Sequence, residues 1–204
     1  VRWDIGISDV QTKHKDIKEI TDKLKNKTVT TGCGQGTIFG SILTKLYDEI
    51  LPDIKIKRSE IFNLLAKITK YNDIYKEAGA VHGCALCNNE GVIEFVEDVG
   101  RHNAVDKIAG WMLLNKEDAN NKIFYTTGRL TSEMVIKTVQ MGIPILISRS
   151  GFTESGVKLA KEAGLTLIGR AKGKKMIIAN GIERVIFDTD TKSIKNEDVV
   201  SAQR

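Results

Sequence analysis

Cysteine, proline and aromatic residues are all scarce in this chain of 204 residues. Three cysteines are too few for a disulfide framework, and their odd number leaves at least one unpaired. The six phenylalanines and four tyrosines do not interleave with basic residues as base-stacking platforms do, so we expect no nucleic-acid partner. No apolar run approaches the roughly 18 residues of a membrane helix, so we expect no membrane span. Together these absences predict a protein of a reducing, cytoplasmic compartment.

The rest of the composition is typical of a globular protein, with 41% hydrophobic and 28% charged residues. A net charge of +5 permits anionic ligands without requiring them. The chain begins with Val1 instead of Met, which leaves open a longer N-terminus, and its first residues do not resemble a signal peptide. We expect a polar segment at 1–29, a single α/β core at 30–190 and a polar tail at 191–204.

Hydrophobic spacing predicts several helices. One is expected over 38–50, ended by Pro52, and a second begins at Ser59 as its N-cap and carries apolar residues to Ile68. A third follows residue 100, with Val105 and Leu113 at the two ends of its apolar face. The helices therefore account for much of the chain outside its strands.

Short apolar runs predict the strands. Segments 80–87 and 92–97 form a hairpin through the turn at 88–91. Strands at 123–126, 145–147 and 165–168 alternate with helices at 132–141 and 154–163, each helix ending at a glycine. This β-α-β-α-β order predicts a mixed α/β fold with a parallel section and right-handed crossovers. Segments 176–178 and 185–187 are expected to pair around Asn180-Gly181.

Two loops of the parallel section combine hydroxyls, a glycine and an arginine at the start of a helix, where an anion can bind. Their candidate residues are Thr127, Gly128, Arg129, Ser148, Ser150 and Gly151. The alternative is that the hydroxyls of these loops, such as those of Thr131 and Thr153, only cap the helices.

Two further segments are rich in charge. Arg170, Ala171, Lys172, Gly173, Lys174 and Lys175 follow the last parallel strand and would suit a diphosphate, although a solvated hairpin tip has the same composition. The segment Glu97 to Asn103 includes Asp98, Arg101 and His102. His102 beside carboxylates could act as a general acid or base, whereas Asp98 or Asn103 could simply cap a helix.

Cys33 is the candidate nucleophile. It lies in Thr31-Gly32-Cys33-Gly34-Gln35-Gly36-Thr37, and a helix is expected within about four residues of it. Backbone N–H groups and a positive helix end would stabilise a thiolate there. A buried structural cysteine and a phosphate-binding loop are the alternatives, although the lysine of a Walker motif is missing.

Cys84-Ala85-Leu86-Cys87, with His82 nearby, has a spacing that could indicate zinc or a redox pair. On a strand, however, His82 and Cys84 share one face and Cys87 lies on the other. Three residues of strand also span about 10 Å, too far for a disulfide. We therefore expect structural cysteines and no metal.

Several strings together resemble the formate dehydrogenase accessory sulfurtransferase family (FdhD/NarQ) between about Thr30 and Val185. They are Val81-His82-Gly83, Glu97-Asp98-Val99-Gly100-Arg101-His102-Asn103-Ala104-Val105-Asp106-Lys107, Thr127-Gly128-Arg129 with Ser132-Glu133-Met134-Val135, and Leu165-Thr166-Leu167-Ile168-Gly169. The resemblance implies a three-layer fold like that of cytidine deaminase, without its chemistry, and a homodimer.

The resemblance also implies a function. A cysteine, here Cys33, would accept sulfane sulfur from a cysteine desulfurase as a persulfide. The sulfur would pass to the molybdenum or tungsten bis-molybdopterin guanine dinucleotide cofactor, mimicked by GDP, before insertion into the formate dehydrogenase catalytic subunit. The family loop usually reads Cys-Gly-x-Cys-Gly, and Gly36 replaces its second cysteine.

The family's cofactor-contacting segment falls on Arg170 to Lys175. The resemblance also carries His82, Asp98, Arg101 and His102 into the expected cofactor site. Two alternatives stay open: a cofactor-binding maturation chaperone without sulfur transfer, and a metal site at His82, Cys84 and Cys87.

Overall fold

We analysed a computed structural model of the chain, which describes residues 2, 4–5, 27–29, 37–39 and 50–188. Contacts divide the chain into two units, residues 1–44 and 45–204. In the first unit, β1 (Lys27–Val29) pairs antiparallel with β2 (Thr37–Phe39). Ile38 therefore lies in a strand, and the helix expected from residue 38 is wrong at its start; residues 40–49 lie outside the described part. β-Branched and aromatic residues at 37–39 favour the extended pairing.

The second unit is built on a six-stranded sheet with the order β5-β4-β6-β7-β8-β9. The strands are β4 (His82–Cys87), β5 (Val92–Asp98), β6 (Ile123–Thr126), β7 (Ile145–Ser148), β8 (Thr166–Lys172) and β9 (Lys175–Asn180). β6, β7 and β8 are parallel, whereas β4, β5 and β9 join the sheet antiparallel. The predicted mixed sheet, its parallel section and the β4–β5 hairpin are confirmed.

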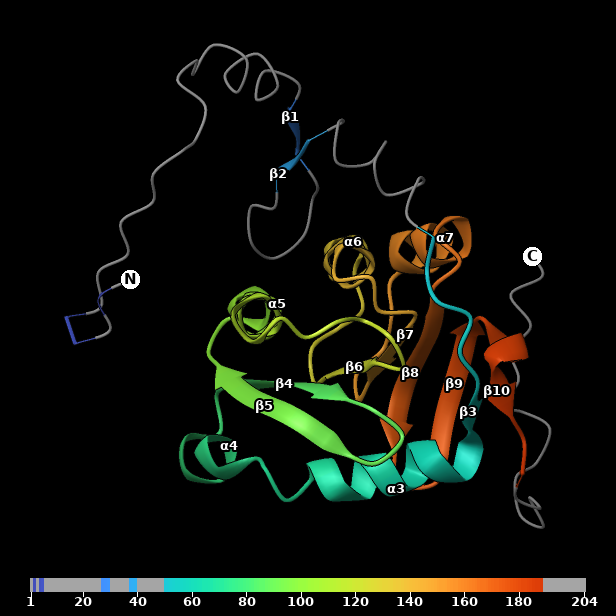
Figure 1. Ribbon diagram of the computed structural model, residues 1–204, viewed down its shortest axis with the longest axis horizontal. Coiled ribbons are helices and arrows are strands. Elements are labelled where there is room, and N and C mark those ends of the chain that lie inside the picture. Colours follow the sequence, from blue (N-terminus) through green and yellow to red (C-terminus); the bar gives the residue numbers. More distant parts are fainter. Residues whose placement is uncertain (1, 3, 6–26, 30–36, 40–49, 189–204) are drawn as a thin grey trace. The chain divides into compact units, whose positions relative to one another are not determined.

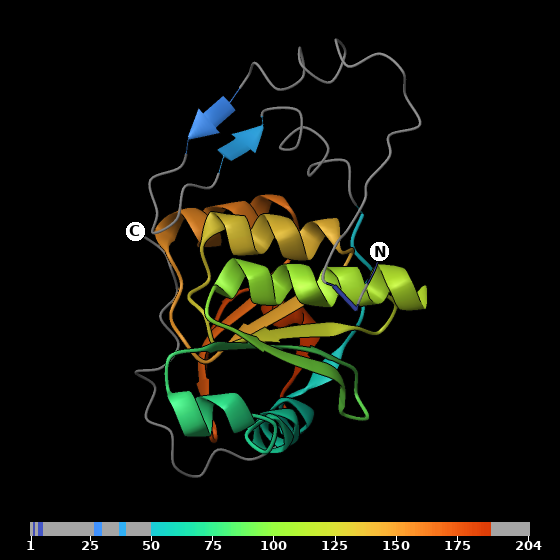
Figure 2. The same cartoon turned by 90° about the vertical axis from the view of Figure 1, so that its left-hand side faces the viewer.

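Helices cover both faces of this sheet (Figures 1 and 2). On one face lie α5 (Arg101–Asn115), α6 (Ser132–Gln140) and α7 (Glu154–Glu162). On the other lies α3 (Arg58–Ile68), followed by the short helix α4 (Asp73–Ala78). The unit thus has three layers, and its likeness to cytidine deaminase in particular stays a prediction. None of the helices in the described residues is long and apolar enough to cross a membrane.

The helix predictions were right in place and partly wrong in detail. Ile61 and Ile68 of α3 are fully buried against the sheet, as the spacing predicted. The N-cap of α3 is Lys57, not Ser59, because the Glu60 carboxylate accepts the Lys57 N–H at 2.8 Å. Leu113 was expected in the core but is 80% exposed, because it lies off the buried face of α5, which carries Val105, Ile108 and Met112.

Two predicted glycine stops are confirmed at the ends of the crossover helices. Gly142 and Gly164 follow α6 and α7 with φ of 73° and 64°, a backbone region that a side chain disfavours. Each glycine turns the chain back toward the next parallel strand. The helix lengths, and with them the positions of the loops at the opposite ends, are set by these two stops.

The expected hairpin around Asn180-Gly181 is wrong. β9 pairs with the preceding strand β8 through a turn at Gly173-Lys174. Residues 182–184 form a 3-10 turn, and β10 (Val185–Ile186) instead pairs in parallel with β3 (Ile56–Lys57) in a separate two-stranded sheet. The chain could fold back at either of two turn signals, and it does so at the first.

Candidate functional site

The two loops predicted at the carboxyl ends of the parallel strands contact each other directly. The Leu130 N–H donates to the Gly151 carbonyl at 3.0 Å, and the Thr153 N–H donates to the Leu130 carbonyl at 3.0 Å. The backbones of Leu130 and Phe152 form an isolated parallel bridge. The prediction that both loops meet at one edge of the sheet is therefore correct.

Most of the hydroxyl groups in these loops are used to hold the loops together. The buried Ser148 Oγ donates to the Gly128 carbonyl at 2.6 Å and accepts the Ser150 N–H at 2.9 Å. The Ser150 Oγ donates to the Thr127 carbonyl at 2.8 Å. The Thr127 Oγ1 accepts the Gly83 N–H at 3.0 Å, so its own hydrogen remains available to a ligand. The two serines therefore shape the site, whereas Thr127 can also donate into it.

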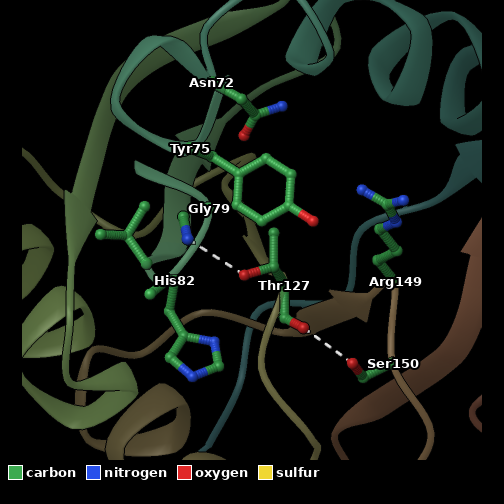
Figure 3. A pocket seen from close by; sticks show the side chains of 10 residues that line it. Asn72, Tyr75, Gly79, His82, Thr127, Arg149 and Ser150 are labelled. Carbon is green, nitrogen blue, oxygen red and sulfur yellow. Dashed lines mark hydrogen bonds between the residues drawn. The ribbon is translucent and has the colours of Figure 1, made fainter. Parts of the chain in front are cut away.

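A pocket of about 460 Å³ opens beside these loops (Figure 3). Residues 79–83 before and within β4 form one side, and Thr127 and Ser150 form the floor. Three predicted site residues, His82, Thr127 and Ser150, thus line one cavity. Their segments are far apart in sequence and meet because β4 lies next to β6, which lies next to β7.

Three further lining residues, Asn72, Tyr75 and Arg149, were not among the candidate site residues, although Arg149 is the arginine of the second predicted anion-binding loop. Tyr75 and Arg149 project from different walls into the space above Thr127 (Figure 3). Arg149 lies inside a predicted loop, and its place between two serines was the signal that could have identified it. Asn72 and Tyr75 come from the start of α4 and from α4 itself, a short helix without a hydrophobic pattern, so nothing in the local sequence marked them.

The basic segment lies at the same edge of the sheet. The Arg170 N–H donates to the Ser150 carbonyl at 2.8 Å, which ties β8 to the loop after β7. Ala171 is buried in the core, Lys172 pairs with Lys175, and Gly173 and Lys174 form the turn between them. Segment 170–175 is thus the end of a β-hairpin, and its cations extend the polar edge. Ala171 serves packing.

Within the described part of the chain, the cations of this edge form no ion pair with an acidic residue. Among the ion pairs of the described residues, none involves Arg129, Arg149, Arg170 or the lysines of segment 172–175. A pocket and a hairpin with unneutralised guanidinium and ammonium groups attract anions, above all phosphates.

Asp98 ends β5, Arg101 and His102 begin α5, and none of the three lines the pocket. Arg101 reaches the loops, because its side chain packs against Gly128. Asp98 accepts the Gly100 N–H at 2.8 Å and pairs with Lys107 at 2.7 Å, and these contacts, the lysine foremost, lower its pKa. Asp98 therefore organises the turn into α5. The N-cap itself is Gly100 and no side chain caps the helix, so the interpretation of Asp98 or Asn103 as a cap is wrong.

His102 forms part of an ionic cluster between α5 and α6. Its Nε2 accepts from Arg101 Nε at 3.2 Å and lies 3.1 Å from Glu133 Oε2. Burial lowers the pKa of His102 and outweighs the opposing effect of the Glu133 carboxylate. A neutral imidazole at pH 7 follows, consistent with Nε2 as an acceptor. The cofactor contacts expected for Asp98 and His102 stay a prediction.

Cys33 lies outside the described residues, whereas the other two cysteines are fully buried in β4. Cys87 joins the core cluster that includes α3, and Cys84 faces the opposite side, where its Sγ lies 3.3 Å from Thr126 Oγ1. The predicted alternation is therefore correct. Burial raises the pKa of Cys84 to about 12 and raises that of Cys87 as well, so both are neutral thiols. No cluster of three or more potential metal ligands occurs in residues 50–188 or the other described segments.

Comparison with known proteins places this geometry in a family context. The family model described as FdhD/NarQ matches residues 1–186. The sequence strings predicted a start at about Thr30, and the match begins earlier, at residue 1. A protein of Saccharolobus solfataricus named sulfur carrier protein FdhD is 38% identical over 170 residues, which are 82% of this chain and 65% of that protein. Its namesake in Wolinella succinogenes is 36% identical over 171 residues, 82% of this chain and 59% of its own length.

A solved structure is similar as well. The crystal structure described as that of a formate dehydrogenase accessory protein from Desulfotalea psychrophila aligns with a TM-score of 0.65 and 35% identity, covering 80% of this chain and 73% of its own. This chain spans about three fifths of the length of the two sulfur carrier proteins. The matched family model covers nine tenths of the chain, so the protein belongs to the FdhD/NarQ family.

Proposed function

We propose that this protein is a sulfur carrier that holds sulfane sulfur on Cys33 and delivers it to a molybdenum or tungsten bis-molybdopterin guanine dinucleotide cofactor. A formate dehydrogenase catalytic subunit receives the sulfur-loaded cofactor, and the sulfur donor is a cysteine desulfurase. Membership of the family and the names of its relatives support the sulfur-carrier role. The formate dehydrogenase link rests on the description of the similar solved structure.

The observation that carries the choice of cysteine concerns the other two. A persulfide carrier needs an accessible thiolate, because the thiolate is the nucleophile. Cys84 and Cys87 are fully buried and their pKa values are raised, so neither can serve without unfolding of β4. Of the three cysteines in the sequence, this leaves Cys33.

The transfer is a thiol–persulfide exchange. The Cys33 thiolate attacks the outer sulfur of a persulfide on the donor protein, a new S–S bond forms at Cys33, and the donor cysteine leaves as a thiolate. In delivery, the S–S bond at Cys33 breaks and its electron pair stays on Cys33, which returns to a thiolate. The outer sulfur leaves as neutral sulfur, so the electron pair of its new bond would come from the acceptor cofactor.

The guanine nucleotides of the cofactor fit the polar edge of the sheet. Their diphosphates are anions, and Arg149, Arg170 and the lysines of segment 172–175 are cations without acidic partners in the described residues. Thr127 has a hydroxyl hydrogen to donate beside them. These groups bind and orient the nucleotide ends of the cofactor, whereas the metal chemistry belongs to the cofactor itself.

Intact-mass spectrometry tests the proposal. Incubation with a cysteine desulfurase and cysteine should add the mass of one sulfur atom to the wild type, and reductant should remove it. The Cys33→Ala variant should gain no sulfur, whereas Cys84→Ala should gain as much as the wild type. Absence of the adduct on the wild type, or its survival in Cys33→Ala, would refute the sulfur-carrier assignment.

A cofactor-binding maturation chaperone without sulfur transfer is the second candidate, and Gly36 in the position of the second loop cysteine favours it. Both functions predict binding of GDP, as a mimic of one nucleotide end, so persulfide formation on Cys33 distinguishes the two. Under the chaperone hypothesis, GDP binds the wild type and Cys33→Ala equally and no persulfide forms. No binding of GDP to the wild type by calorimetry would exclude the chaperone.

A further inference from the structure

The wall of the pocket formed by α4 is held in place by few contacts. This helix has six residues, none of them buried, so hydrophobic packing does not fix it against the sheet. Tyr75 nevertheless lines the pocket from α4, and Asn72 lines it from the N-cap position. Another interaction must determine where these two side chains lie.

Glu97 supplies that interaction from β5. Its Oε2 accepts the Ile74 N–H at 2.9 Å and its Oε1 accepts the Tyr75 N–H at 2.9 Å. Both oxygens of one carboxylate thus bind free N–H groups in the first turn of α4, where a negative charge is favourable. Lys107 Nζ donates to the Glu97 carbonyl at 3.2 Å, so α5 supports the strand at the same residue.

A ring contact is the second tie between this segment and β5. The rings of Tyr71 and Phe95 lie 5.6 Å apart at an angle of 37°. Phe95 and Glu97 point to the same face of β5 because side chains alternate along a strand. Glu94 lies at the opposite parity, on the other face, and is the matched acidic residue of that strand.

We propose that Glu97 is a positioning residue that fixes α4 as a wall of the pocket, and that Tyr75 and Asn72 contact a guanine nucleotide held there opposite Arg149. Tyr75 is 46% exposed and its ring offers an apolar face to a planar base, while Arg149 suits the phosphates of the nucleotide. Asn72 can both donate and accept at a base edge. This inference rests on the proposed binding of guanine nucleotides and adds the residues that organise it.

The test compares Glu97→Gln with Glu94→Gln in the full chain, since each removes one negative charge from β5. Calorimetry with GDP measures affinity, and amide hydrogen exchange of segment 73–79 measures how firmly α4 is held. Glu97→Gln should raise the Kd for GDP about tenfold and speed the exchange of Ile74 and Tyr75, because an amide nitrogen cannot accept an N–H. Glu94→Gln should change neither. Tyr75→Ala should raise the Kd while the Ile74 N–H stays protected.

The outcomes separate this inference from the sulfur-carrier function. An unchanged Kd in Glu97→Gln, or equal effects of the two glutamate variants, overturns the positioning role of Glu97. If the wild type gains sulfur on Cys33 but binds no GDP, the nucleotide pocket is refuted and sulfur transfer stands. If Glu97→Gln alone weakens GDP and no persulfide forms on the wild type, the pocket stands and sulfur transfer is refuted.

Discussion

The two buried cysteines of β4 should resist alkylation in the native protein by a large and calculable factor. At pH 8 an ordinary cysteine, with a pKa of about 8.5, is roughly one quarter thiolate. Burial raises the pKa of Cys84 to about 12, which leaves roughly one part in 10,000 as thiolate at the same pH. The reactive form is thereby reduced roughly 2,000-fold, before the obstruction by surrounding side chains is counted.

Timed alkylation with iodoacetamide at pH 8, followed by peptide mass spectrometry, measures this factor. The same protein in urea provides the reference, because all three thiols are then accessible. We expect Cys84 and Cys87 to react at least a hundredfold more slowly in the native protein than in urea, and Cys33 to react at a similar rate in both. Native alkylation of Cys84 within tenfold of its rate in urea would contradict the burial on which the choice of Cys33 depends.

Four further predictions concern stability. Gly156→Ala should destabilise the protein by about 1–3 kcal/mol, because the added Cβ would lie 2.6 Å from the Leu130 carbonyl oxygen. Gly110→Ala in α5 should stabilise it by roughly 0.5–1 kcal/mol, because the added Cβ meets nothing within 4 Å. Denaturant unfolding measures both changes in the free energy of unfolding. Burial raises the pKa of Tyr125 to about 12, so stability should fall as pH rises from 10 through 12, and thermal unfolding of Tyr125→Phe should show a smaller fall. The pKa of His102 is lowered, so the unfolded chain takes up the proton first and stability should fall as pH drops below about 6.5; an equal slope in His102→Gln would contradict this.

Much of the sheet could be predicted from the sequence because its strands are short apolar runs bounded by glycine or polar turns. β6 and β7 were placed to within a residue on this basis. The partner of β9 was wrong because two turn signals, Gly173-Lys174 and Asn180-Gly181, compete, and local sequence does not rank them. Residues 185–186, which were expected to pair with β9, pair with β3 instead, a contact distant in sequence.

The site was predictable where it consists of loops at strand ends, and not where distant segments supply its walls. Thr127 and Ser150 belong to loops whose location follows from the order of strands. Tyr75 is held beside the pocket by a hydrogen bond to the Glu97 carboxylate, 22 residues away in the sequence. The helix α4 has no apolar periodicity that could have predicted this position. Periodicity detects what packs on a core, so a wall held by hydrogen bonds escapes it.

The parallel pairing of β3 with β10 has a consequence for how the protein is made. Ser59, next to β3, bonds to Asp188, next to β10, across 129 residues of chain. During synthesis Ile56 emerges early, but its partner Val185 exists only after the whole sheet has been translated. A contact of such sequence separation forms slowly because it closes a very long loop. Until the last strand has been translated, β3 has no strand partner, so this pairing completes the fold only after the six-stranded sheet has been made.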